Sequence, residues 1–118
     1  MIEEEFKFDN YSRHLGVRGR YDWYEWKVFM VEPPEVLEKI STVEYRLHET
    51  FPNPIRIVKD RKSGFALSSA GWGNFTIHIT VYLKDGREIP KKYYLELKKP
   101  WPSSEPTKYD INTIGTSY

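Results

Sequence analysis

The stretch NFTIHITVYL, residues 74–83, decides the fold class because its apolar and polar side chains alternate strictly. Successive side chains of a β-strand point to opposite faces, so this pattern predicts a strand with one buried and one solvated face. The dipeptide Asp85–Gly86 follows it and is typical of a hairpin turn, which predicts a returning strand through YYLEL at residues 93–97. The side chains expected on the buried face are Phe75, Ile77, Ile79, Val81 and Leu83.

The same period of two recurs upstream, at residues 26–31 and 43–50. Two shorter strands are expected at residues 55–58 and 65–68, joined by a polar loop in which Gly64 can adopt a positive φ. The residues expected to face the core from the two upstream segments are Trp26, Val28, Met30, Val43, Tyr45 and Leu47.

About seven to eight short antiparallel strands, with turns about every eight to twelve residues, predict an all-β fold, an immunoglobulin-like β-sandwich. A closed barrel fits less well because the sequence has no barrel-corner glycine pattern. We place the sandwich at residues 21–99, after an N-terminal segment (residues 1–20) and before an irregular C-terminal tail (residues 100–118) whose start Trp101 would pin to the body. The segment EPPEVLEKI, residues 32–40, predicts one or two turns of helix.

The amino-acid composition limits the classes of function that the chain can have. The 118 residues are 39% hydrophobic and 30% charged, which suits one compact domain, and the net charge of +1 creates no global field toward nucleic acid or anionic lipid. Cysteine is absent, which excludes disulfides and thiolate chemistry. The N-terminus is acidic where a signal peptide needs positive charge, and no stretch reaches the length of a membrane span. We therefore expect a cytoplasmic protein, or a nuclear one if the host is eukaryotic.

Two loop segments gather unusual side chains. LHETFPNP, residues 47–54, leaves its strand where Pro52 can no longer donate to a ladder, so Phe51 would be released toward the end of the sandwich. GWGNF, residues 71–75, sets an indole between two glycines, which lets the backbone turn tightly and exposes the main-chain N–H of Trp72. Loops at one end of a sandwich lie together, so Phe51 and Trp72 could form two walls of a slot.

These two segments carry a family resemblance. LHETFPNPIR followed by GWGNFTIHITVYL resembles the YEATS domain family, whose pattern is Leu-His-x-Ser/Thr-Phe-Pro-x-Pro-x-Arg and then Gly-Trp/Tyr-Gly/Ala-x-Phe. The similarity runs from about Trp26 to Leu97. It implies an immunoglobulin-like sandwich that reads acylated lysine, acetyl or crotonyl, on histone tails without performing chemistry on it.

The resemblance also implies roles for individual residues. Phe51 and Trp72 would sandwich the flat acyl-amide, the Thr50 hydroxyl and the Trp72 N–H would bond it, and His48 would orient the hydroxyl. Gly71, Gly73 and Phe75 would shape the loop and anchor it. An uncharged planar amide with two hydrogen-bonding edges suits such an aromatic slot, whereas unmodified lysine keeps its charge and its water.

The sequence departs from the family upstream. Family members often show Gly-Phe/Tyr-Thr-His-x-Trp, which lends a third aromatic, and this chain reads GRYDWYEW at residues 19–26. Trp23 or Tyr24, or else Tyr21, would then have to supply that wall. KDRKSGF, residues 59–65, replaces a Pro-Pro-Phe often found before the second motif. These departures resemble the shorter prokaryotic members, so the expected partner is an acylated-lysine peptide or protein, and a histone only where the host has histones.

Other function classes fit less well. His14, His48 and His78 are scattered without the spacing of metal ligands, and no nucleophile motif is present, so we expect no metal, no cofactor and no enzyme activity. Two alternatives stay open. One is a protein–protein interaction module whose pocket is degenerate. The other is a binder of single-stranded nucleic acid, in which exposed aromatics stack bases beside Lys59, Arg61 and Lys62.

Overall fold

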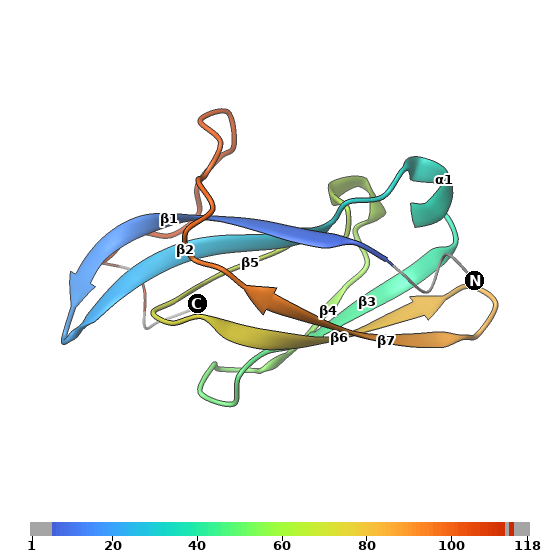
Figure 1. The fold of residues 1–118 in the computed structure, drawn as a ribbon, viewed down its shortest axis with the longest axis horizontal. Coiled ribbons are helices and arrows are strands. Elements are labelled where there is room, and N and C mark those ends of the chain that lie inside the picture. The colour runs from blue at the N-terminus through green and yellow to red at the C-terminus, as the bar shows by residue number, and fades with distance from the viewer. Residues whose placement is uncertain (1–5, 113, 115–118) are drawn as a thin grey trace.

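The computed structural model describes residues 6–112 and 114, which form two antiparallel sheets packed face to face. Figure 1 shows them as two layers. The three-stranded sheet has the order β1-β2-β5, and the four-stranded sheet has the order β4-β3-β6-β7. The strands are β1 (Phe8–Arg18), β2 (Tyr21–Met30), β3 (Ile40–Arg46), β4 (Ile55–Val58), β5 (Leu67–Gly71), β6 (Phe75–Leu83) and β7 (Glu88–Leu95). The all-β, immunoglobulin-like sandwich expected from the sequence is confirmed.

The strand that decided the fold class lies inside the four-stranded sheet. β6 pairs with β3 on one side and with β7 on the other, and the turn between β6 and β7 contains Gly86 at a φ of 99°. Its inward side chains are buried from Ile77 to Leu83, and Phe75 is partly buried at the pocket end. The alternation and the hairpin are therefore as predicted, but the returning strand, Glu88–Leu95, ends two residues before the predicted segment 93–97 does.

Of the two short strands, one agrees with the prediction, and the other is shifted at both ends, from residues 65–68 to Leu67–Gly71. β4 covers the predicted residues, but β5 begins at Leu67 because Gly64 and Phe65 both have positive φ values, 76° and 55°. This left-handed pair turns the chain from one sheet into the other, since β4 pairs with β3 and β5 pairs with β2. The helix α1 (Pro34–Leu37) is a single turn with proline at its start, as expected.

The first strand, β1, was not predicted. It pairs with β2 along its length, with a bulge between His14 and Gly16. Its inward side chains include Asn10 and Ser12, which are buried but polar, so the period-two apolar signal is missing. Asn10 is satisfied from the other sheet, where its amide donates to the carbonyl of Glu96 and its carbonyl accepts from the Tyr93 hydroxyl. The division of the chain at residues 20 and 99 stays a prediction.

Residues 101–112 form no helix or strand, and they dock on the outer face of the three-stranded sheet. Trp101 meets Tyr11 edge to face with ring centroids 4.7 Å apart, which fits its expected role at the start of the tail. Further along, Tyr109 joins Trp23 and Ala70 in a small cluster separate from the main core. These side chains lie on the opposite face of the sheet from Trp26, by the alternation of the strands.

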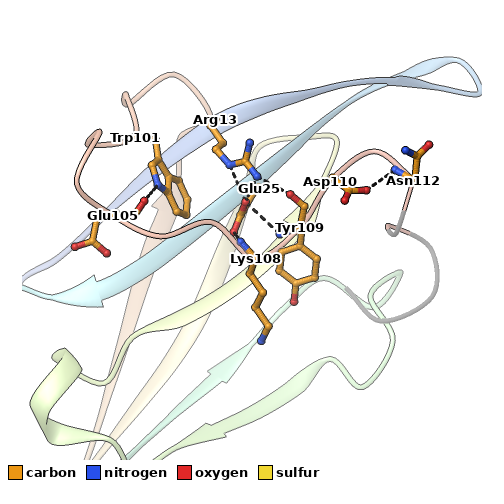
Figure 2. Close-up of polar contacts among 8 residues, drawn as sticks. All are labelled: Arg13, Glu25, Trp101, Glu105, Lys108, Tyr109, Asp110 and Asn112. Carbon is orange, nitrogen blue, oxygen red and sulfur yellow. Dashed lines mark hydrogen bonds and ion pairs between the residues drawn. The ribbon is translucent and has the colours of Figure 1, made fainter.

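A buried carboxylate holds this part of the tail. The Glu25 side chain, 1% exposed, accepts hydrogen bonds from Arg13 at 2.8 Å, from the main-chain N–H of Lys108 at 2.8 Å and from that of Tyr109 at 3.4 Å. Figure 2 shows Glu25 enclosed between the arginine and the tail backbone. Buried charges need this degree of pairing, so Glu25 fixes where the tail crosses the sheet.

Candidate functional site

A pocket of about 290 Å³ lies where the β3–β4 loop meets the β5–β6 connection. Both segments lie in the left half of Figure 1. A volume of this size is at the lower end of the range for small-ligand sites. The lining residues are His48, Thr50, Phe51, Gly71, Trp72, Gly73, Asn74 and Phe75. The structure therefore brings six of the eight sequence-predicted site residues to one cavity and adds Asn74 and Phe75.

The β3–β4 loop is held in shape by its own backbone and by an arginine. The N–H of Leu47 donates to the Pro54 carbonyl at 2.8 Å, and the N–H of Phe51 donates to the His48 carbonyl at 3.0 Å. The Arg56 guanidinium donates to the carbonyls of Pro52 and Asn53 at 2.8 and 2.6 Å. The terminal arginine of the first motif thus braces the proline corner, a role that the sequence pattern alone did not reveal.

His48 and Thr50 form a polar pair at the pocket. The Nδ1 atom of His48 lies 3.2 Å from the main-chain nitrogen of Thr50 and 2.9 Å from its Oγ1. Because a main-chain N–H can only donate, Nδ1 is an acceptor, which assigns the ring proton of the neutral imidazole to Nε2. The Thr50 hydroxyl then donates to Nδ1. Its oxygen lone pairs remain available to a donor that enters the pocket.

Phe51 is the floor of the pocket and not a free-standing wall. Its ring is 9% exposed and packs against Trp26 and Phe75, with centroids 6.1 and 5.2 Å away. A Cβ atom placed on Gly71 would lie 3.1 Å from Cζ of Phe51. Gly71 is therefore required by the close approach of this ring, whereas Gly73 has open space around it.

This difference gives a matched pair of substitutions. Gly71→Ala should displace the Phe51 ring and lower the free energy of unfolding by about 1–3 kcal/mol, the usual cost of overpacking. Gly73→Ala should change it by less than about 0.5 kcal/mol because nothing lies near the added methyl group. Urea unfolding of both variants measures the two values, and equal values would contradict the close packing of Phe51 on Gly71.

Trp72 is the exposed aromatic of the site, at 44%. One face of its indole stacks on Tyr21, with centroids 4.0 Å apart and an interplanar angle of 14°. Among residues 6–112 and 114, its main-chain N–H has no protein acceptor. The pocket thus combines an available main-chain donor, a hydroxyl acceptor and exposed aromatic surface. The family model described as prokaryotic YEATS domain matches residues 24–96.

The chain belongs to the YEATS family. Among curated proteins it is similar to the "Protein AF-9 homolog" of Kluyveromyces lactis, 37% identical over 62 residues, 51% of this chain and 27% of that protein. It is also similar to the one of Eremothecium gossypii, 37% identical over 97 residues, 79% of this chain and 46% of that protein. The chain therefore spans less than half the length of these relatives.

A solved YEATS domain has the same fold. The structure titled "The Yaf9 YEATS domain Recognizing H3K122suc Peptide" superposes with a TM-score of 0.64 at 26% sequence identity. The match covers 77% of this chain and 70% of that one. The similarity to this YEATS structure confirms the recognition made from the two motifs.

The third aromatic of the YEATS pattern is where the sequence-based expectation was wrong. Trp23 is 8% exposed and packs under the tail with Tyr109, and Tyr24 packs on His14 at 5.1 Å between centroids. Neither lines the pocket. Trp23 shares the strand face of Glu25, and there the tail residue Tyr109 packs against it. Tyr21, which the sequence also offered, is the residue that contacts Trp72.

Two negative findings concern the described residues. No group of three or more His, Asp or Glu side chains in residues 6–112 and 114 could hold a metal ion. In the same part of the chain, no helix is both long and apolar enough to cross a membrane.

Proposed function

We propose that this YEATS domain is a non-catalytic module that binds acylated lysine in the pocket between the β3–β4 loop and the β5–β6 connection. The observation that carries the proposal is the pairing of Thr50 with His48 opposite an available Trp72 N–H. An amide has one donor and one acceptor, and the pocket offers one group for each. The other aromatic and glycine residues of the lining supply apolar contact.

The proposed contacts are specific. The Nζ–H of the acyl-lysine would donate to Thr50 Oγ1, whose own proton points to His48, and the acyl carbonyl would accept from the Trp72 N–H. The acyl chain would lie over the exposed part of Phe51 and beside the indole of Trp72. Two net hydrogen bonds of about 1 kcal/mol each and aromatic contacts of about 0.5–1.5 kcal/mol each support a Kd between about a micromolar and a millimolar.

Unmodified lysine should bind far more weakly. Its ammonium group would have to give up water, and Thr50 Oγ1 is an uncharged acceptor. Among residues that line the pocket, none is an aspartate or a glutamate that could neutralise the charge. Recognition by this site would therefore depend on the loss of the lysine charge on acylation.

A similar solved structure supports the choice of binding partner that we propose for this chain. The Yaf9 domain is described as recognising an H3K122suc peptide, which is an acylated lysine in a peptide. For this chain we propose an acylated-lysine peptide or protein as the partner, a histone only where the host has histones, and a cytoplasmic location, or a nuclear one in a eukaryote. The identity of the acylated protein lies beyond the pocket chemistry.

The test is a titration with three peptides of one sequence that carry lysine, acetyl-lysine or crotonyl-lysine, followed by ¹⁵N amide spectra. We expect shifts at the amides of Thr50, Phe51 and Trp72 with the two acylated peptides only. Shifts with all three peptides would indicate a general interaction module, and no shifts would reject the proposal. A single-stranded oligonucleotide in a parallel titration tests the nucleic-acid alternative, whose affinity would fall steeply with salt.

A further inference from the structure

The outer face of the four-stranded sheet carries a row of basic side chains. The strand register sets Arg46 of β3 opposite His78 of β6, and His78 opposite Lys92 of β7. Opposed residues of neighbouring strands have Cβ atoms about 4.5–5.5 Å apart, so the three side chains form one continuous line. We name Arg46, His78 and Lys92 the basic row.

The basic row adjoins the pocket. Arg46 precedes His48 by two residues, and His78 follows the pocket residue Phe75 by three. Two residues of a strand span about 6.6–6.8 Å, so both strands run from the row directly into the pocket segments. An extended peptide whose acyl-lysine enters the pocket would place residues two or three positions away over the row.

The row is exposed and only partly neutralised. The Arg46 side chain is 58% exposed, and its contact with Glu44 is long, at 3.8 Å. Glu44 also accepts a hydrogen bond from the Tyr82 hydroxyl, which draws it away from the row. In the part of the chain that the structure describes, neither His78 nor Lys92 makes an ion pair.

Apolar side chains flank the row. Ile55 continues it onto β4 opposite Arg46 and is 47% exposed, and Tyr94, two residues past Lys92, is 54% exposed. Exposed apolar side chains rimmed by polar ones are typical of a surface that contacts another protein. The acidic residues nearest Arg46 in the sequence are Glu44 on β3 and Glu49 on the pocket loop.

We infer that the peptide bound at this pocket carries acidic residues beside its acylated lysine, and that these pair with Arg46 and Lys92. The inference rests on the proposed function and names its substrate class. The side chain of an acetyl- or crotonyl-lysine has no charge and is the same in every sequence, so a preference for one sequence over another has to come from the flanking residues. Complementary charge across an interface provides such a preference.

The experiment uses three crotonyl-lysine peptides of equal length whose flanking positions are glutamate, glutamine or arginine. At about 0.05 M salt we expect the glutamate peptide to bind about two- to tenfold more tightly than the glutamine peptide, since exposed ion pairs are individually weak. The arginine peptide should bind more weakly than both. At about 0.5 M salt the differences should largely disappear because the charges are screened.

Substitutions on the sheet test which side chains cause the preference for the glutamate peptide. The double variant Arg46→Gln, Lys92→Gln should remove the preference and leave binding of the glutamine peptide unchanged. The matched control, Lys39→Gln with Lys84→Gln, makes the same change in charge at the other end of the sheet, beside the paired residues Ile40 and Leu83. It should keep the preference.

The possible outcomes distinguish the proposed binding of acylated lysine from the inferred preference for acidic flanking residues. Equal affinities for the three peptides would overturn this inference and leave the proposed function standing. Absence of binding by all three would overturn the proposed function and this inference with it. Binding of the glutamate peptide without its crotonyl group, at the same affinity, would show that the row acts without the pocket and would also overturn the inference.

Discussion

Trp72→Ala should weaken binding of a crotonyl-lysine peptide at least about tenfold, because it removes the largest exposed aromatic surface of the pocket. The Trp72 N–H remains in the variant, so the loss reports the indole itself. Folding should be affected little, by about 0.5–1.5 kcal/mol from the lost stacking on Tyr21. Calorimetric titration and urea unfolding measure the two effects separately.

Two related variants make the result specific. Trp72→Phe keeps an aromatic face and should retain most of the affinity. Tyr21→Ala removes the stacking partner and should lower the affinity less than Trp72→Ala does, because Tyr21 does not line the pocket. If Trp72→Ala unfolds the domain, the indole serves packing, and if binding is unchanged, the acyl group does not bind in this pocket.

Glu25→Ala should lower the free energy of unfolding by about 3–5 kcal/mol, the usual effect of breaking a buried ion pair. The carboxylate is 1% exposed, and its removal takes the shared acceptor from the Nε–H of Arg13 and from the N–H groups of Lys108 and Tyr109, so that Arg13 keeps the Tyr109 carbonyl as its acceptor. Urea unfolding measures the loss. Hydrogen exchange at the Lys108 and Tyr109 amides should also accelerate as the tail detaches.

Glu105→Ala is the matched control on the same tail. Its carboxylate is 34% exposed and pairs with Lys27 at 3.1 Å, so the substitution should lower the free energy of unfolding by no more than about 1 kcal/mol. Figure 2 draws both glutamates. Similar small losses in the two variants would contradict a tail that is held by the buried carboxylate.

Local pattern predicted much of the sandwich. The strands around Val43, Tyr45 and Ile77 alternate apolar and polar residues because one face of each lies in the core, so period and burial agree. The pocket loops were also found from the sequence, since their special residues act locally. Phe51 follows the His48–Thr50 pair in one turn, and Gly71 needs no side chain beside that ring.

The missed features depend on distant partners. β1 was not predicted because its inward residues Asn10 and Ser12 are polar. Their hydrogen-bond partners lie in residues 93–99, too far along the chain for a local sequence pattern to include them. Trp23 was a candidate for the third wall of the pocket because the sequence does not distinguish an exposed aromatic on a strand from one that a distant tail covers. The tail decides between them by packing Tyr109 against it.

The sequence by itself determined the fold class and most of the residues that line the pocket, because alternation along a strand and turn chemistry within one loop are short-range properties. It also carried the two motifs that place the chain in the YEATS family. Only the tertiary structure decided which aromatic reaches the site, how the tail crosses the sheet, and that Arg46, His78 and Lys92 stand in one row. Those facts depend on strand register and on contacts between residues far apart in the chain, and the energies that select them appear only after the sheets have packed.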